Sequence, residues 1–179
     1  MKAVVIILIL LVGGFILVNN SPAENVLYDL GDTATRPFKY ASLLAKEPEE
    51  KIEIPIRGLR RSQIANTWGA PRGADRKHQG QDLFAKRGTP ILSATEGYVW
   101  RIGENKLGGK TVWVIGAGGR VYYYAHLGGY AENLKVGDAV STETVLGYVG
   151  TTGNAKGTPP HLHFGVYTST GAIDPLELF

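Results

Sequence analysis

Hydrophobic and polar positions divide the chain into three regions. Residues 3–18 form an unbroken apolar run that follows Lys2 and precedes a polar stretch. From residue 24 to residue 51 the pattern is mixed, and from Ile52 onward short apolar runs alternate with glycines. The pattern predicts a signal peptide or membrane anchor at 1–23, a stalk or linker at 24–51 and one domain at 52–179.

The leader has the layout of a secretory signal, with a positive charge, an apolar stretch and then small residues, so cleavage after Ala23 is one expectation. The alternative is an uncleaved anchor helix, although the run would cover only about 24 Å of a roughly 30 Å hydrocarbon core. Both interpretations place residues 24–179 outside the cytoplasm. We therefore expect an exported protein, periplasmic or at the cell surface, which in the anchored case associates with the inner membrane through residues 3–18.

The region before Ile52 contains one helical pattern and one charged stretch. The sequence RPFKYASLLAK, from Arg36 to Lys46, predicts a short helix with Phe38, Leu43 and Leu44 on or near one side. The stretch KEPEEKIE that follows is dense in charge and predicts a solvated face.

The region from Ile52 onward is predicted to be all-β. Its apolar runs are short, and the glycine pairs at 108–109 and 118–119 mark tight turns. The runs cover residues 89–94, 97–102, 110–115, 120–126, 144–150 and 161–167. No amphipathic helix of ordinary length lies among them, so we expect an antiparallel β-sandwich or open barrel.

Composition excludes several classes of function. The 179 residues include no cysteine, which excludes disulfides, thiolate metal sites and cysteine nucleophiles. The formal net charge of +3, from 19 basic and 16 acidic residues, is too small and too scattered for a nucleic-acid-binding protein. No phosphate-binding glycine loop leads into a helix, so we expect no nucleotide site.

The candidate chemistry lies in four histidines, which are His78, His126, His161 and His163. On a strand, His161 and His163 would share one face about 6.6 Å apart, close enough to serve a metal and its bound water together. Asp82 follows His78 by four residues, which on a straight strand is about 13 Å. Shared ligation by His78 and Asp82 therefore requires a bend, and Gly80 sits where the bend is needed.

The run that ends at His126 predicts a groove wall. By strand alternation, Tyr122, Tyr124 and His126 share one face, whereas Tyr123 points the other way. A single histidine is more often structural or exposed than functional. The functional interpretation is favoured here because all four histidines fall into three compact elements of the β-rich region.

The order of these elements resembles the lysostaphin-type zinc metallopeptidase domain, which acts on bacterial cell-wall peptides. The resemblance extends from about Ile52 to the C-terminus. The matching segments are HQGQDL (78–83), RGTPILSATEGYV (87–99), YYYAHL (122–127), VGDAVSTETVLGYVGTTG (136–153), PHLHFGVY (160–167) and IDPLELF (173–179).

The resemblance implies a groove on a β-rich fold with one Zn²⁺ per chain. It implies that His78, Asp82 and His163 bind the metal and that His126 and His161 are catalytic. Three protein ligands leave a fourth position for water, the pattern of a catalytic zinc site. Either catalytic histidine can serve as the base. The proximity of His161 to His163 favours His161 in that role and His126 as the oxyanion stabiliser.

We therefore expect a zinc-dependent metalloendopeptidase that hydrolyses peptide cross-links of bacterial peptidoglycan. The bond is open between a direct stem-peptide cross-link and a glycine-rich bridge. The candidates for lining the substrate groove are Tyr98, Trp113, Tyr122 and Tyr124.

The sequence also allows two other interpretations. One is a non-catalytic cell-wall-binding module that activates or scaffolds another wall hydrolase, although such relatives usually lack metal ligands. The other is a lipoyl- or biotinyl-type carrier, which is disfavoured because no lysine lies between Lys135 and Lys156. The sequence identifies neither the oligomeric state nor a regulatory partner for the 24–51 segment.

Overall fold

The computed structural model describes residues 36–72 and 76–179. The predicted leader and residues 24–35 of the predicted stalk lie outside these residues. Residues 39–179 form one compact unit, so the boundary expected at Ile52 does not coincide with the edge of that unit. Within the described ranges, no helix is long and apolar enough to cross a membrane.

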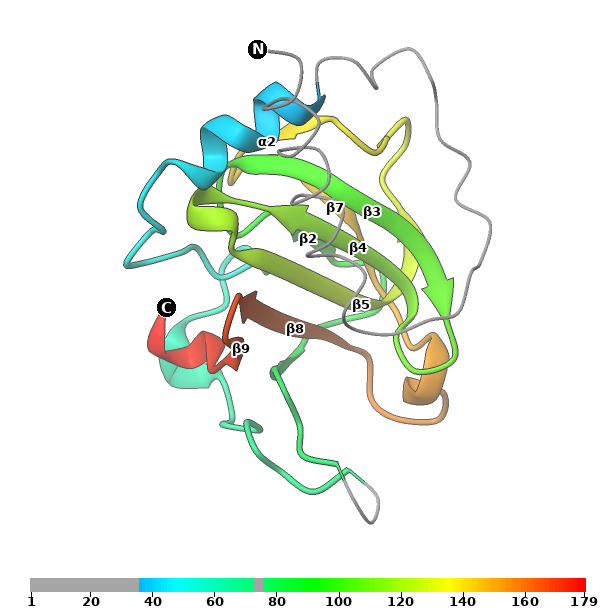
Figure 1. Ribbon diagram of the computed structural model, residues 1–179. Coiled ribbons are helices and arrows are strands. Elements are labelled where there is room, and N and C mark those ends of the chain that lie inside the picture. Colours follow the sequence, from blue (N-terminus) through cyan, green and yellow to red (C-terminus); the bar gives the residue numbers. More distant parts are fainter. Residues whose placement is uncertain (1–35, 73–75) are drawn as a thin grey trace, which may run out of the picture. The chain divides into compact units, whose positions relative to one another are not determined.

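The compact unit is built on a nine-stranded antiparallel sheet that curls into an open half-barrel (Figure 1). The strands are β1 (Gln81–Phe84), β2 (Pro90–Leu92), β3 (Gly97–Asn105), β4 (Gly109–Ile115), β5 (Val121–Tyr130), β6 (Ala139–Val140), β7 (Val145–Val149), β8 (His161–Thr168) and β9 (Gly171–Ile173). The main path runs β1-β8-β5-β4-β3-β6, with β9 beside β8 and β7 bridging β5 and β2. Among the described residues the helices are α2 (Arg36–Leu44) and four short 3-10 turns, η2 (Arg61–Gln63), η3 (Ala117–Gly119), η4 (Gly153–Ala155) and η5 (Pro175–Glu177). The all-β antiparallel prediction is confirmed.

The two faces of the sheet have different roles. Strand alternation buries one face as the core, where Val112 of β4 and Phe164 of β8 are fully buried. The opposite face carries a row of rings from three neighbouring strands. Trp113 of β4 lies 4.1 Å from Tyr123 of β5 and 5.9 Å from Tyr167 of β8, measured between ring centroids. This second face is the one on which the candidate site lies.

Helix α2 lies where the sequence predicted a helix and packs on the sheet through a few side chains. Leu43 is buried, and the ring of Tyr40 lies 4.9 Å from Trp100 and 6.0 Å from Tyr98. Leu44 was expected on the packed side, but its side chain is half-exposed. The Phe38 side chain lies outside the described part of the structure.

The charged stretch after α2 is not simply a solvated face. The carboxylate of Glu49 accepts hydrogen bonds from the Thr95 hydroxyl (2.6 Å) and the Tyr122 hydroxyl (3.2 Å). Its backbone carbonyl accepts one from the Arg120 guanidinium at 2.7 Å. The prediction of a solvated face is therefore wrong at Glu49, because its carboxylate contacts the Tyr122 hydroxyl at the edge of the core. The contacts fasten the segment before Ile52 to the sheet.

Candidate metal centre

Two neighbouring strands and one loop bring the predicted metal ligands together. In the antiparallel pair of β1 and β8, Asp82 lies directly opposite His163. His78 precedes β1, and its backbone is held against the preceding loop by hydrogen bonds with Ala70 and Gly69. Gly80 lies between them at a bend of the backbone, as the sequence predicted, and close packing is a second reason for glycine there. A Cβ atom there would lie 2.7 Å from Cε1 of His163, so only glycine allows this close approach.

The three donor groups converge on one point. His78 Nε2 lies 2.8 Å from His163 Nδ1 and 3.0 Å from Asp82 Oδ1. His163 Nδ1 lies 3.2 Å from the same carboxylate oxygen. Ligand atoms bound to a tetrahedral zinc at about 2.05 Å stand about 3.3 Å apart. The donor triangle needs to open by only a few tenths of an ångström, so these residues fit a Zn²⁺ ion.

Polar groups behind the donors fix their orientation. The Thr67 carbonyl accepts a hydrogen bond from His78 Nδ1 at 2.7 Å, which leaves Nε2 free to face the site. The second carboxylate oxygen of Asp82 is paired with the Arg72 guanidinium. Burial would raise the pKa of Asp82, but hydrogen bonds and the charges of His163 and His78 outweigh it and lower the pKa well below its usual range. Asp82 is therefore held as a carboxylate, the form that binds metal.

The two predicted catalytic histidines stand beside this cluster. Their ring centroids are 5.0 Å apart, and His126 lies 5.9 Å from His163. The Nδ1 atoms face backbone carbonyls, with Thr152 O at 2.9 Å from His126 and Pro159 O at 2.8 Å from His161. Because a carbonyl only accepts, each Nδ1 carries the proton and each Nε2 is left as an acceptor. The pKa of His126 is lowered to about 4 by burial and by the neighbouring His163 and His161.

The alternation of side chains between the two faces of the strand is broken at His126, so part of the predicted groove wall is wrong. His126 adopts a left-handed backbone conformation with φ of 66°, which turns its ring to the face that carries Tyr123. Tyr122 and Tyr124 are fully buried in the core, and the hydroxyl of Tyr124 accepts a hydrogen bond from the Ala94 backbone N–H. The prediction that these two tyrosines line the groove is wrong. Tyr123, predicted to face away, lies 5.8 Å from His163 between ring centroids.

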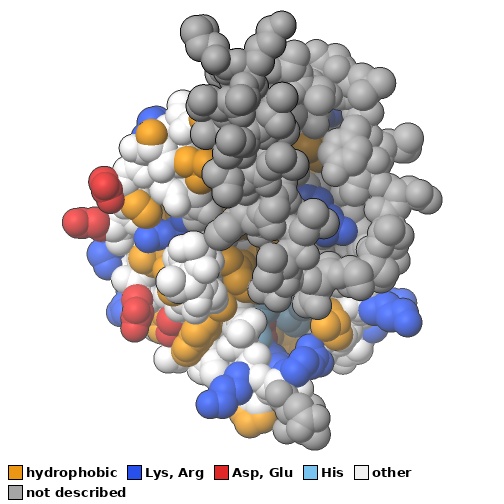
Figure 2. Space-filling view, in the orientation of Figure 1, with side chains coloured by type: hydrophobic (Ala, Val, Ile, Leu, Met, Phe, Trp, Pro, Cys, Tyr) orange, Lys and Arg blue, Asp and Glu red, His pale blue; other side chains and the backbone are white. Residues whose placement is uncertain are grey.

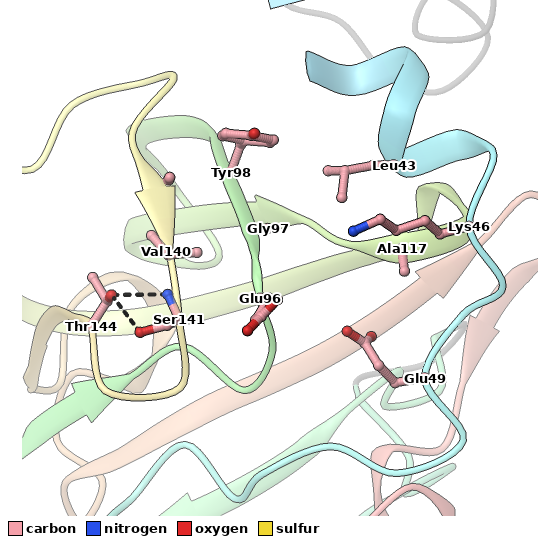
Figure 3. A pocket seen from close by; sticks show the side chains of 11 residues that line it. Leu43, Lys46, Glu49, Glu96, Gly97, Tyr98, Ala117, Val140, Ser141 and Thr144 are labelled. Carbon is pink, nitrogen blue, oxygen red and sulfur yellow. Dashed lines mark hydrogen bonds between the residues drawn. The ribbon is translucent and has the colours of Figure 1, made fainter. Parts of the chain in front are cut away.

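The other two groove candidates have different surroundings. Trp113 is partly exposed on the site face beside Tyr123, and its role in binding stays a prediction. In Figure 2 the histidine side chains (pale blue) are visible at the surface with Lys and Arg side chains around them. Tyr98 packs beneath α2 and lines a separate pocket of about 360 Å³, together with Leu43 and Lys46 (Figure 3). The histidines of the site do not line this pocket. Tyr167 was missed, although strand alternation in HLHFGVY places it on the face of His163.

Comparison with known proteins identifies the family of this site. Residues 76–175 match peptidase family M23. The chain belongs to this family. The M23 match includes all four histidines and Asp82, and the β-rich groove fold that the resemblance implied is confirmed.

Among M23 relatives, the L-Ala–D-Glu endopeptidase of Bacillus subtilis is 37% identical over 133 residues, which are 70% of this chain and 40% of the relative. The lysostaphin catalytic domain of Staphylococcus simulans has a TM-score of 0.57 at 31% identity, covering 65% of this chain and 92% of that structure. Csd3 of Helicobacter pylori has a TM-score of 0.59 at 34% identity, covering 72% of this chain and 33% of that structure. The chain spans less than half the length of the curated relatives that it matches first.

Proposed function

We propose that this protein is a zinc-dependent metalloendopeptidase that hydrolyses peptide cross-links of bacterial peptidoglycan. The observation that carries the proposal is the convergence of three donor atoms, 2.8 to 3.2 Å apart, beside two imidazoles with free Nε2 atoms. Relatives named as an L-Ala–D-Glu endopeptidase and as a glycyl-glycine endopeptidase support this class of reaction. The reaction requires that the protein reach the cell wall, so we also propose export, to the periplasm or the cell surface.

His78, Asp82 and His163 would hold the metal, with Arg72 and the Thr67 carbonyl keeping two of these ligands in position. When bound there, Zn²⁺ supplies a Lewis acid and lowers the pKa of its water to about 7. The donor residues are mostly buried, and electrostatic interactions between buried groups are stronger than in bulk water. An intact donor set is also the reason to prefer an enzyme over a non-catalytic wall-binding module.

The remaining two histidines, His126 and His161, would act on the proton of the attacking water. Nε2 of His161 lies 3.9 Å from Asp82 Oδ1, at the edge of the metal centre. With its Nδ1–H fixed by the Pro159 carbonyl, this Nε2 accepts a proton from the attacking water and later returns it to the leaving amine. His126, fixed in the same way by Thr152, presents a second acceptor, with its ring centroid 5.0 Å from that of His161 and 5.9 Å from that of His163. The lowered pKa of His126 opposes a second proton on its ring, so we assign the proton to His161 while the peptide bond breaks.

The experiment is digestion of purified peptidoglycan by the zinc-loaded full chain, with the released fragments identified by mass spectrometry. The matched control is His161→Ala, which keeps all three metal ligands, with bound zinc measured for both proteins. New peptide fragments from the unchanged chain, absent with the control, are expected. Intact peptide bonds after digestion by folded, zinc-loaded protein would contradict an endopeptidase function and favour the wall-binding module.

A further inference from the structure

Three segments border the metal centre and form its walls: residues 69–72 with 76–78, residues 84–88 and residues 150–160. The first segment carries His78 and contributes Arg72, which pairs with Asp82. The second begins at Phe84, whose half-exposed ring lies 5.3 Å from His161. The third supplies the carbonyls that hold the two catalytic histidines, and its Thr151 hydroxyl accepts a hydrogen bond from Arg87 of the second segment at 2.8 Å.

These walls are strongly basic. In their described part they carry six cations and only one acid near them, the metal ligand Asp82. The cations are Arg72, Arg76, Lys77, Lys86, Arg87 and Lys156. One further acid in the sequence, Asp75, lies outside the described residues. Five of the six cations are exposed, Arg72 being the partly buried one.

Among the described residues, no ion pair neutralises the five exposed cations of the walls. Within the described part of the chain, Arg72 is the one wall cation that forms an ion pair, and its partner is Asp82. In Figure 2, blue Lys and Arg side chains lie below and to the right of the pale-blue histidines, whereas most of the visible red acidic side chains lie on the left of the view. A group of acids clusters instead near the end of α2, at Glu47, Glu49, Glu50, Glu53 and Glu96. The positive potential is thus concentrated where a substrate would bind.

We propose that these wall cations select peptides with free carboxylates next to the scissile bond, so that the substrate is an acidic stem peptide rather than a neutral glycine bridge. This inference rests on the proposed endopeptidase function. Stem peptides carry free α- and side-chain carboxylates, whereas an oligoglycine bridge is uncharged along its length. Lys77 directly precedes the ligand His78 on one wall, and Lys86 follows Phe84, whose ring contacts His161, on the other. Each wall therefore offers an exposed cation to a carboxylate of the substrate.

The size of the effect follows from the exposure of these side chains. Exposed charge pairs are worth about 0.2–1 kcal/mol, and salt weakens them because the screening length is about 8 Å at physiological ionic strength. Loss of one wall cation is therefore expected to reduce the preference for the charged substrate about 1.4- to 5-fold. Loss of one cation from each wall is expected to give the product of the two reductions if the walls act independently.

The test compares two synthetic stem peptides, one with free carboxylates and one with each carboxylate converted to a carboxamide, together with pentaglycine. The measured quantity is the ratio of kcat/KM for the acidic peptide to that for its amidated form. We expect a ratio of at least about fivefold for the unchanged chain, falling as salt is raised. The variants are Lys77→Gln, Lys86→Gln and their combination. Lys46→Gln, at the opposite edge of the sheet beside β3 and β6, is the control.

The outcomes separate this inference from the proposed function. A ratio that falls in the wall variants but not in Lys46→Gln supports selection by the wall cations. Equal cleavage of the acidic and amidated peptides, or faster cleavage of pentaglycine, overturns the selection and leaves the endopeptidase function standing. Weaker binding to whole cell walls with an unchanged ratio shows general attraction to polyanions and also overturns it. No cleavage of any peptide by zinc-loaded protein contradicts the proposed function itself.

Discussion

The substitution Gly80→Ala tests whether the tight packing behind His163 holds the metal ligands in place. A Cβ atom at position 80 would lie 2.6 Å from the Phe164 carbonyl oxygen, and 2.7 Å and 2.9 Å from Cε1 and Nε2 of His163. Ordinary van der Waals contact begins at 3.4 Å, so the new methyl group is about 0.5 to 0.8 Å too close. Phe164 cannot retreat, because it pairs with Gln81 on one side and Tyr124 on the other.

Relief must therefore come largely from the His163 imidazole. A movement of about 0.5 Å exceeds the tolerance of about 0.2 Å for metal–ligand distances. Overpacking of this kind typically costs about 1–3 kcal/mol of stability. Errors in ligand placement typically lower metal affinity ten- to hundredfold, which corresponds to about 1.4–2.8 kcal/mol of binding free energy. We expect Gly80→Ala to show both effects.

The assay is competition for Zn²⁺ against a chromophoric chelator, with urea denaturation of the metal-free protein measured in parallel. Gly129→Ala is the matched control, because it lies in β5, lacks a positive φ and has no atom within 4 Å of the added Cβ. The control is expected to change neither quantity. The reasoning is refuted if Gly80→Ala binds zinc within twofold of the unchanged chain and keeps its stability within about 0.5 kcal/mol.

Three further predictions address the groups around the site. Thr152→Val removes a hydroxyl that donates a hydrogen bond to the Leu127 carbonyl at 2.8 Å and accepts one from the Lys110 N–H at 2.9 Å. We expect this change to lower stability by about 1–3 kcal/mol in urea denaturation and to lower kcat, and we expect Thr152→Ser to restore both. Glu49→Gln should cost about 1–2 kcal/mol, and thermal unfolding that matches the unchanged chain would contradict the anchoring role of Glu49. Burial, with Glu49 nearby, raises the pKa of Tyr122 from 10.0 to about 12. The unfolded chain then loses this proton first, so the free energy of unfolding falls between pH 10 and 12 by up to about 1.4 kcal/mol per pH unit. Tyr122→Phe should remove that part of the slope in a denaturation series across this range.

Much of the fold could be predicted because its strands obey a simple period. The alternation in β4 and β8 places Val112 and Phe164 in the core and leaves Trp113 on the other face, as an antiparallel sheet with one buried face requires. What could not be predicted is how the segment before Ile52 contacts the sheet. Its helix was visible as a pattern, but the contact of Glu49 with Tyr122 joins residues 73 positions apart. Charge density alone favours solvent over such a contact.

The residues that converge on the candidate site could be predicted, whereas their surroundings could not. The family resemblance pointed to His78, Asp82 and His163, whose donor atoms lie close together, and the spacing of His161 and His163 was correctly interpreted as two residues on one strand. The assignment of Tyr122 and Tyr124 to the groove failed at one backbone dihedral angle. A positive φ at a non-glycine residue leaves no trace in the hydrophobic pattern. His126 was therefore grouped with Tyr122 and Tyr124, whereas its ring lies on the face of Tyr123.

The same local geometry limits which chemistry His126 can perform. Its Nδ1 proton is committed to the Thr152 carbonyl, so a neutral ring has only a lone pair at Nε2. Stabilising an oxyanion by donation from Nε2 would require a second proton on the ring, and burial among other histidines opposes that charge. The loop that carries Thr152 and Pro159 imposes the same restriction on His161. His126 therefore stays a neutral hydrogen-bond acceptor, and His161, at the edge of the metal centre, is the ring that we expect to accept and return the proton. The charge on the carbonyl oxygen must be met by another group of the site.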